Sequence, residues 1–297
     1  MAAGTAGADG GDGAPLRIGL VQLNVTDDPA ANLPVTEAFV REAAAGGARL
    51  VITPEVTNIV SASRAHQEAV LGTEAEDATL ATLRAVAAET GIWLVIGSLA
   101  LKEPAAGDDR FVNRQFVIGP DGTVVARYDK IHMFDVELGG EESYRESEGF
   151  RPGAHAVVAD TPFARLGLGI CYDVRFPALF RATAEAGASI LLAPAAFTVP
   201  TGRAHWEVLL RARAIETGSF VLAAAQTGQH RASRGKERAT WGHSLAVAPW
   251  GDVIADGGEA PGVTFAELDL SAVAAARRRI PALANARRFE APSAVSG

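Results

Sequence analysis

Cys171 is the only cysteine in the chain, and its surroundings indicate more than a buried thiol. It follows the apolar run 165–170 and precedes Pro177, a residue suited to the first turn of a helix. The sequence therefore predicts a strand, a sharp turn and a helix start, where free backbone N–H groups favour a thiolate. The alternative is simple packing, because free cysteine is among the most often buried residue types.

Two other strand ends carry the groups that a nucleophilic thiol requires. Hydrolysis by a thiol needs a base for its proton and a cation or N–H donors for the oxyanion. Glu55 follows a strand and a proline in "VITPEVTN", and Lys130 follows the second strand of a hairpin in "VARYDKIHMFDVE". Either residue alone is typical of a solvated strand end. Together with Cys171 they favour a hydrolytic site.

The histidines do not indicate a metal centre. His132, His155, His205, His230 and His243 are scattered, and no pair has the His-x₃-His spacing of a metal-binding helix. The chemistry outlined for the thiol requires no metal. We therefore expect neither a metal nor a cofactor.

The elements that must position these side chains follow an alternating pattern. From residue 16 onward, short apolar runs alternate with helical periodicity, which is typical of a layered α/β domain. Some predicted strands form hairpins and others follow helices, so a mixed sheet is expected. The acidic, glycine-containing segment 135–153 predicts a long exposed loop. The predicted strands are 16–23, 49–54, 92–100, 165–170, 189–193, 220–225, 241–248, 252–256 and 262–269, with a hairpin at 113–128; the predicted helices are 33–46, 77–90, 177–186, 203–217 and 271–279.

Composition and charge limit the partners and the location. The chain has 297 residues, 48% of them hydrophobic, and a formal net charge of −8, which argues against a nucleic-acid or anionic-membrane partner. The start lacks the features of a secretory signal, and no apolar run approaches the ~20 residues of a spanning helix. A single cysteine fits a reducing compartment, so we expect a cytoplasmic protein. We expect one domain over residues 15–290, with tails at 1–14 (disordered) and 291–297.

Five segments together resemble one enzyme family. They are "PEVTN", "YDKIHMFDVE", "GICYDVRFP", "AHWEVLLRARAIE" and "GHSLAVAPWG". In this order they resemble the carbon–nitrogen hydrolase (nitrilase) superfamily, from about Leu16 to Arg288. Within it, the wording resembles the amidase branch that acts on deaminated glutathione, with the ω-amidases close behind. Tyr172-Asp173 stand where true nitrilases usually carry Trp-Glu.

The resemblance implies a fold and a set of roles. The fold would be a four-layer α-β-β-α sandwich with mixed sheets, and the active site a Glu-Lys-Cys triad. Glu55 would be the general base, Lys130 would stabilise the tetrahedral intermediate, and Cys171 would be the nucleophile. Glu146, in "YRESEGFRPG", would help to orient Lys130 and the substrate amide. By analogy the protein would be a homodimer or larger.

Substrate contacts are less clearly indicated. The backbone N–H of Tyr172 would help Lys130 to hold the oxyanion. Arg175 could pair with a substrate carboxylate through its planar fork, or form a structural ion pair with Asp173 or a nearby glutamate. Thr198 is a weaker candidate for the pocket wall.

The leading hypothesis is an amidase that cleaves the amide of deaminated glutathione to 2-oxoglutarate and cysteinylglycine through a cysteine thioester. The alternative within the family is an ω-amidase acting on 2-oxoglutaramate or another small carboxylate-bearing amide. Two hypotheses from other classes stay open. One is a catalytically idle binding or scaffold protein on the same fold, and the other is a redox sensor that uses Cys171 without hydrolysis.

Overall fold

The computed structural model describes residues 14–104, 107–139 and 142–290 and contains two six-stranded sheets. In the first, the strand order is β16 (Gly262–Leu268), β1 (Leu16–Gln22), β2 (Leu50–Ile52), β3 (Trp93–Leu101), β4 (Val112–Ile118) and β5 (Val124–Asp129). In the second, it is β15 (Val253–Asp256), β14 (Leu245–Val247), β11 (Phe220–Ala223), β10 (Ile190–Leu192), β9 (Arg165–Gly167) and β8 (Val158–Asp160). Nearly all of the predicted tails 1–14 and 291–297 lies outside the described residues.

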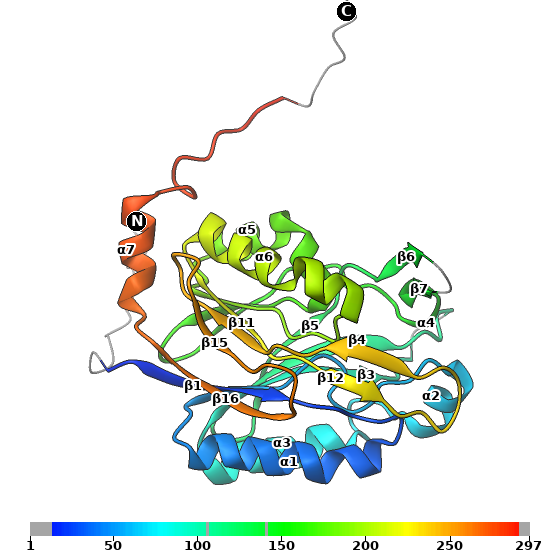
Figure 1. Cartoon of the computed structure of the whole chain (residues 1–297). Helices are drawn as coiled ribbons and strands as arrows, with labels where there is room; N and C mark the ends of the chain where they lie inside the picture. Colours follow the sequence, from blue (N-terminus) through cyan, green and yellow to red (C-terminus); the bar gives the residue numbers. More distant parts are fainter. Residues whose placement is uncertain (1–13, 105–106, 140–141, 291–297) are drawn as a thin grey trace, which may run out of the picture.

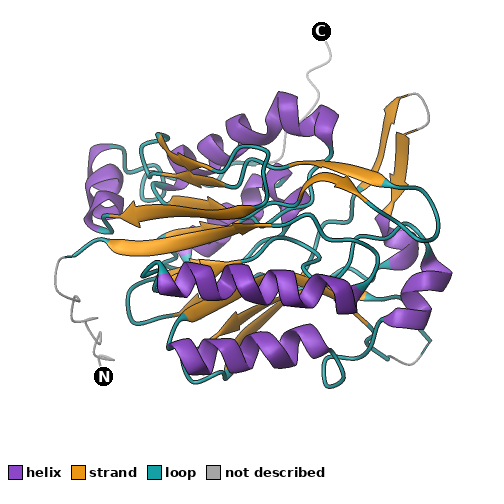
Figure 2. Ribbon diagram, turned by 60° about the horizontal axis from the view of Figure 1, so that its bottom comes forward, coloured by secondary structure: helices purple, strands orange, loops and turns teal. Residues whose placement is uncertain are grey.

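The two sheets lie between layers of helices (Figures 1 and 2). Helices α1 (Pro29–Ala45) and α3 (Ala78–Thr90) cover the first sheet, and α5 (Pro177–Glu185) and α6 (Val199–Thr217) cover the second. The last helix, α7 (Ser271–Arg279), follows β16. This is the predicted α-β-β-α sandwich. Both sheets are mixed: β2 runs parallel to β1 and β3, β10 runs parallel to β9 and β11, and the outer pairs are antiparallel.

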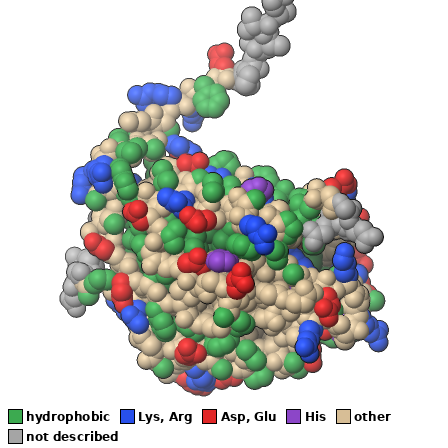
Figure 3. All heavy atoms as spheres, viewed as in Figure 1, with side chains coloured by type: hydrophobic (Ala, Val, Ile, Leu, Met, Phe, Trp, Pro, Cys, Tyr) green, Lys and Arg blue, Asp and Glu red, His purple; other side chains and the backbone are tan. Residues whose placement is uncertain are grey.

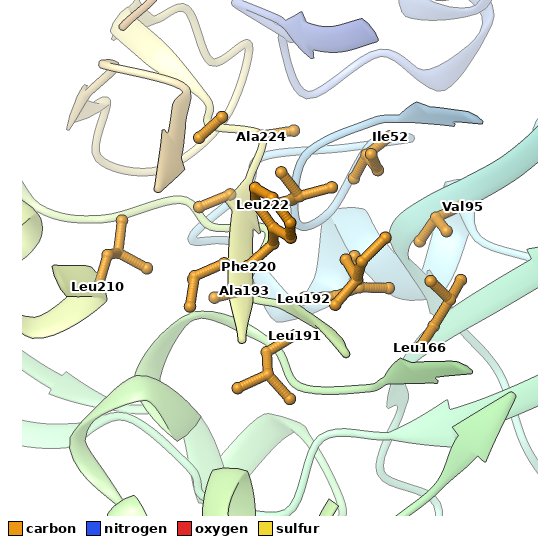
Figure 4. Packing of buried hydrophobic residues seen from close by; sticks show 14 of the residues in the cluster. Ile52, Val95, Leu166, Leu191, Leu192, Ala193, Leu210, Phe220, Leu222 and Ala224 are labelled. Atoms are coloured by element: carbon orange, nitrogen blue, oxygen red, sulfur yellow. The ribbon is translucent and has the colours of Figure 1, made fainter. Parts of the chain in front are cut away.

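Alternating side chains of the central strands fill two separate cores. In β2, Leu50 and Ile52 face the second sheet, whereas Val51 packs under the helices of the first. Figure 4 shows Ile52 and Val95 of the first sheet across from Leu192 and Leu222 of the second. Because both faces are buried, these strands read as continuous apolar runs in the sequence.

All five predicted helices are present, and two of them begin four residues earlier than predicted: α6 begins at Val199 and not at residue 203, and α1 shows the same shift. Helix α1 begins at Pro29, four residues before the predicted residue 33. The side chain of Asp28 accepts hydrogen bonds from the N–H groups of Ala30 and Ala31 and thereby caps the helix. The cap, rather than the apolar periodicity, sets where the helix begins.

Two predictions of secondary structure were wrong, and both concern the rim of the sandwich. The predicted loop 135–153 contains a two-stranded ribbon, β6 (Asp135–Gly139) and β7 (Glu142–Arg145), and a short helix, α4 (Glu146–Gly149). The predicted strand 241–248 is two strands in two sheets, because Gly242 and His243 have φ of 74° and 56° and break it. Its first part belongs to the ribbon of β12 (Thr227–His230) and β13 (Arg238–Trp241). Helix α2 (Arg64–Val70) was not predicted.

These rim elements lack the apolar periodicity on which the predictions depend. In Figure 1, β6, β7, α4 and α2 are labelled at the right-hand side of the molecule, and β12 is labelled nearer its centre. None of the described helices is long and apolar enough to cross a membrane. On the face drawn in Figure 3, basic and acidic side chains are interspersed.

The two sheets approach each other closely at Gly97 in β3, next to the segment that follows β2. A Cβ at this position would lie 2.0 Å from the Thr53 carbonyl oxygen, 2.5 Å from that of Pro54 and 2.6 Å from the Cβ of Pro194. Backbone atoms cannot yield as a flexible side chain can. We expect Gly97→Ala to lower the free energy of unfolding by about 3 kcal/mol, near the upper end for overpacking, as measured by urea denaturation.

Gly149→Ala is the matched control, since the nearest atom to its added Cβ is an Arg64 side-chain nitrogen at 3.9 Å. This variant should retain the unfolding free energy of the wild type within about 1 kcal/mol. Equal stability of the Gly97 and Gly149 variants would contradict the packing argument.

Candidate active site

Three strand ends bring Glu55, Lys130 and Cys171 together at one end of the sandwich. Lys130 Nζ lies 2.7 Å from Glu55 Oε1, and the Cys171 thiol is hydrogen-bonded to the Glu55 carboxylate. Glu146, in α4, contacts the same ammonium with both of its oxygens at 2.9 Å. The side chains come from the ends of β2, β5 and β9 and from the rim. Residues far apart in the sequence thus form one polar cluster, as their positions at strand ends suggested.

The cluster is almost fully enclosed by protein. Glu55 is 4% exposed, Lys130 2% and Cys171 6%. Buried ionised groups are tolerated where they are paired and hydrogen-bonded, and here every charged atom has such a partner. The second oxygen of Glu55 accepts a hydrogen bond of 2.9 Å from the backbone N–H of Ala196.

The backbone is held in an unusual conformation beside two of these residues. Cys171 has φ of +48° and begins a 3-10 helix, η1 (Cys171–Arg175), while its N–H donates to the Pro194 carbonyl at 2.9 Å. Val56, directly after Glu55, also has φ of +48°, and its N–H donates to Ser98 Oγ at 2.8 Å. Left-handed φ is rare for residues with a Cβ and is retained only where surrounding contacts enforce it. The elbow turns the thiol toward Glu55.

Asn113 is a member of the cluster that sequence reasoning missed. Its Nδ2 donates to Glu55 Oε1 at 2.9 Å and lies 3.3 Å from Glu146 Oε1, so it bridges the two carboxylates. The backbone carbonyl of Asn113 accepts a hydrogen bond from the backbone N–H of Lys130. The available signal was the polar run Asn-Arg-Gln at the start of the first strand of the predicted hairpin.

The charges fix the protonation states of the three central groups. Burial raises the pKa of the Glu55 carboxyl. The Lys130 ammonium and the hydrogen bonds lower it by more than burial raises it, so the pKa lies below its usual range. Burial also lowers the pKa of Lys130, yet the charges of Glu146 and Glu55 hold it above the ordinary value. The site therefore contains an ammonium beside two carboxylates.

The thiol differs from the prediction. Burial and the neighbouring Glu55 charge raise the pKa of Cys171 well above its usual value, against the opposing effect of Lys130. The expected stabilisation of a thiolate at the helix start is outweighed by desolvation and by the carboxylate. Cys171 is thus a neutral thiol beside the Glu55 carboxylate, and a neutral thiol needs a base to take its proton before it can act as a nucleophile.

A second buried carboxylate ties the segment of Lys130 to the elbow of Cys171. Asp173 is fully buried, and its oxygens accept four hydrogen bonds. The donors are Ile170 N–H at 2.9 Å, Tyr128 OH at 2.7 Å, His132 N–H at 3.1 Å and His132 Nδ1 at 2.7 Å. These bonds fix the relative positions of the ammonium and the sulfur.

The cluster lies in the wall of a cavity of about 500 Å³, which is large enough for a small organic ligand. Apolar side chains such as Ile59, Phe134 and Phe150 form part of its wall. Among the described lining residues, five are cationic and three are acidic, so the wall has a net formal charge of +2 although the chain carries −8. The cationic residues are Arg64, Lys130, Arg145, Lys236 and Arg238, and the acidic ones are Glu55, Glu146 and Glu148.

The three residues predicted to bind substrate lie outside the described lining of this cavity. Tyr172 packs edge-on against Phe134, with ring centroids 5.1 Å apart. Arg175 lies over the Phe197 ring at 5.3 Å and within 3.3 Å of His205 Nδ1; the carboxylate of Asp173, its suggested partner, is bonded elsewhere. Thr198 is buried, with its hydroxyl 2.6 Å from that of Thr201.

Charged residues of the rim line the cavity instead, and the sequence reasoning did not select them. The run "RASRGKER" at 231–238 was the available signal for Lys236 and Arg238. Within the described part of the chain, no group of three or more His, Cys, Asp or Glu side chains could hold a metal ion.

Comparison with known proteins identifies the same family along most of the chain. Residues 17–278 match the family model described as carbon-nitrogen hydrolase. A deaminated glutathione amidase of Yersinia enterocolitica is 38% identical over 91% of this chain and 92% of its own length. An omega-amidase, NIT2 of Homo sapiens, is 37% identical over 89% of this chain and 92% of its own length.

Solved structures agree with the fold. The C. elegans NitFhit protein superposes with a TM-score of 0.84 at 37% identity, covering 92% of this chain and 65% of that one. A mutant amidase from Nesterenkonia sp. AN1 has a TM-score of 0.71 at 28% identity, covering 91% of this chain and 97% of its own. That structure shows the acetamide moiety of fluoroacetamide added covalently to the active-site cysteine.

Removal of the central ammonium should make stability depend on pH in a specific direction. In Lys130→Met, Glu55 and Glu146 are left desolvated and close together, so the pKa of at least one rises above its unfolded value. Stability is then present at low pH and lost as the pH rises, and we expect the variant's deficit to grow from pH 5 to pH 8, reaching about 3 kcal/mol or more at pH 8. Urea unfolding at both pH values measures it.

The wild type should change little over this range. The lowered pKa of Glu55 gives stability that is present above its unfolded pKa of about 4.3 and lost as pH falls through the folded pKa. The raised pKa of Lys130 gives stability that is present below about 10.4 and lost as pH rises through the folded pKa. Lys102→Met, which removes a lysine bonded to a backbone carbonyl, is the control. Equal deficits of Lys130→Met at pH 5 and pH 8 would contradict the charge assignment.

Proposed function

Since the chain belongs to the carbon–nitrogen hydrolase (nitrilase) superfamily and is an amidase, we propose that its substrate is deaminated glutathione, which it cleaves to 2-oxoglutarate and cysteinylglycine. The proposal assigns Cys171 as the nucleophile, Glu55 as the general base and acid, and Lys130 as the oxyanion donor. Their contacts and burial support these roles, and the cysteine adduct of the Nesterenkonia amidase supports covalent catalysis.

In the first half of the proposed reaction, Glu55 accepts the proton of Cys171 while the sulfur attacks the amide carbonyl carbon. The electron pair of the carbonyl moves to its oxygen, which Lys130 and the backbone N–H of Tyr172 stabilise; Tyr172 is at the second position of η1, where N–H groups lack a partner inside the helix. Loss of one such donor typically costs about 3 kcal/mol. The carbon–nitrogen bond then breaks, Glu55 protonates the leaving nitrogen, and a thioester remains.

In the second half, Glu55 removes a proton from water, and the hydroxide attacks the thioester carbonyl. The carbon–sulfur bond breaks, the acid product leaves, and the proton returns from Glu55 to Cys171. Glu146 serves as a positioning residue in both halves. Because it contacts the ammonium with two oxygens, one N–H of Lys130 can turn to the oxyanion while the ion pair persists.

The charge of the cavity wall carries the choice of substrate. Deaminated glutathione is a dianion with one carboxylate on each side of the scissile amide, and it can pair with the cations of the cavity wall that have no acidic partner among the described residues, Lys236 and Arg238. The alternative substrate, 2-oxoglutaramate, is a smaller monoanion, which would fill only part of the cavity of about 500 Å³. The similarity of this chain to an omega-amidase, at 37% identity, keeps that alternative in view.

The structure disfavours the hypothesis of a redox sensor. Oxidation of a cysteine follows its thiolate character and its exposure. The pKa of Cys171 is raised by burial and by Glu55, and only 6% of the residue is exposed. A binding or scaffold role would not require the three groups to be arranged for proton transfer.

We further propose that residues 15–290 form one catalytic domain and that the chain works in the cytoplasm as a homodimer or larger.

The two substrates can be separated by their leaving groups. With purified protein, we expect deaminated glutathione to be cleaved with a kcat/KM at least ~10-fold above that for 2-oxoglutaramate, since only the former has a carboxylate on both sides of the scissile amide. Release of cysteinylglycine and of ammonia is assayed separately. Cys171→Ala should lose a factor of about 10⁴ or more on either substrate. Faster turnover of 2-oxoglutaramate would transfer the assignment to the ω-amidase reaction.

The intermediate itself should be detectable. Brief exposure of the wild type to deaminated glutathione, followed by acid quenching, should add a 2-oxoglutaryl group to the peptide containing Cys171 in mass spectra. The same treatment of Cys171→Ala is the control. Turnover without any adduct on Cys171, under conditions in which acylation outpaces hydrolysis, would rule out the thioester mechanism.

A further inference from the structure

The ribbon of β12 and β13 brings two cations to the cavity that have no acidic partner in the described structure. Lys236 and Arg238 both line the cavity. The other two outer cations are paired, Arg64 with Glu68 at 2.8 Å and Arg145 with Glu137 at 2.6 Å. Positive charge is therefore available to a ligand mainly from this ribbon.

The guanidinium of Arg238 is held in place but uses few of its hydrogen-bond donors. Its Nη2 donates to the Ala196 carbonyl, and its plane lies 5.4 Å from the centroid of the Tyr144 ring. Its Nε is buried and has no hydrogen-bond partner among the described residues. A planar group with five N–H donors and spare capacity is suited to a carboxylate.

The ribbon itself is fixed to the body of the protein. Asp27 accepts hydrogen bonds from the N–H and the hydroxyl of Ser233 at 2.7 and 2.8 Å. His230 joins Val25 O and Thr240 Oγ1, both at 2.7 Å. The cations are thus presented on a pre-organised support, which reduces the entropy lost when a ligand binds.

Ala196 shows on which side of the scissile amide Arg238 lies. Its carbonyl accepts from Arg238, and its N–H donates to Glu55 Oε2 at 2.9 Å. In the proposed reaction Glu55 protonates the leaving nitrogen, so it faces the amine side of the substrate, whereas Lys130 and the N–H of Tyr172 face the oxyanion. Arg238, one residue away from Glu55 through Ala196, lies on the amine side.

We propose that Arg238, with Lys236 beside it, binds a carboxylate on the amine portion of the substrate. The site then takes secondary amides in which an amino acid or short peptide is the leaving group. This inference rests on the proposed function, because it uses Glu55 as the acid for the leaving nitrogen. It adds a subsite that selects the leaving group, and deaminated glutathione meets it with its terminal glycine carboxylate.

Arg238→Met tests the subsite through the difference between two substrates. We expect kcat/KM for deaminated glutathione to fall about 10- to 100-fold more than kcat/KM for 2-oxoglutaramate, which has no carboxylate on its amine side. Arg231→Met removes an exposed arginine from the same ribbon and serves as the matched control. Equal losses on both substrates would overturn the inference, since they would show that Arg238 acts on Glu55 through Ala196.

A binding measurement separates this inference from the substrate assignment. Calorimetric titration of Cys171→Ala with cysteinylglycine and with cysteinylglycinamide compares ligands that differ only in the carboxylate. We expect the acid to bind at least ~10-fold more tightly, and we expect this preference to vanish in Cys171→Ala/Arg238→Met. Equal affinity for acid and amide would refute the subsite even where deaminated glutathione is turned over. A preference for the acid in a protein that does not turn over deaminated glutathione would support the subsite and reject the proposed substrate.

Discussion

The rest of the site depends on one ammonium buried between two carboxylates. Lys130 cannot remain charged at 2% exposure without Glu55 and Glu146, and Glu55, which is 4% exposed, cannot remain ionised without Lys130. This mutual requirement holds Glu55 as a carboxylate next to a thiol whose own pKa is raised. In the proposed mechanism this pairing keeps the base, Glu55, beside a nucleophile that carries its proton until a carbonyl carbon arrives. The same pairing prevents the competing arrangement, in which Cys171 is a permanent thiolate open to oxidation.

Such a cluster can exist only where several independent contacts hold the backbone in place. The residues come from different sheets, so the separation of the two sheets sets the distance between base and nucleophile. Gly97 permits the close approach, and the left-handed conformations of Val56 and Cys171 aim the two side chains. Asp173 then links the segment after β5 to the elbow by bonds from both. The cluster is therefore supported by a closely packed part of the molecule, where displacement would disturb packing as well as the proposed chemistry.

The difference between the closely packed sandwich and its polar rim explains what the sequence could predict. The central strands are buried on both faces and the helices on one, so their apolar patterns predicted a layered α/β domain with a mixed sheet and located Glu55, Lys130 and Cys171 at strand ends. The four-layer sandwich was implied by the family resemblance and not by these patterns. The ribbons β6–β7 and β12–β13 bury few apolar side chains, and polar sequence such as 227–241 has no periodicity that indicates a strand. Asn113 was missed because it is the first of three consecutive polar residues, Asn113-Arg114-Gln115, and nothing in the sequence distinguishes it from the other two. The thiol was assigned too acidic a character because the charge of Glu55 is a tertiary effect, invisible from the residues around Cys171.

The difference between the sandwich and its rim also affects how the site could select its substrate. The charged wall of the cavity comes largely from the rim, from Arg64 in α2, Arg145 in β7, and Lys236 and Arg238 at the second ribbon. These residues are partly exposed, so replacing them costs little folding stability compared with replacing a buried strand-end residue. A scaffold of this kind can retain its chemistry while the rim changes the leaving groups that it accepts. A deaminated glutathione amidase and an omega-amidase have nearly equal identity to this chain. This fits the proposal that selection depends on a few rim positions, because overall identity is dominated by the sandwich.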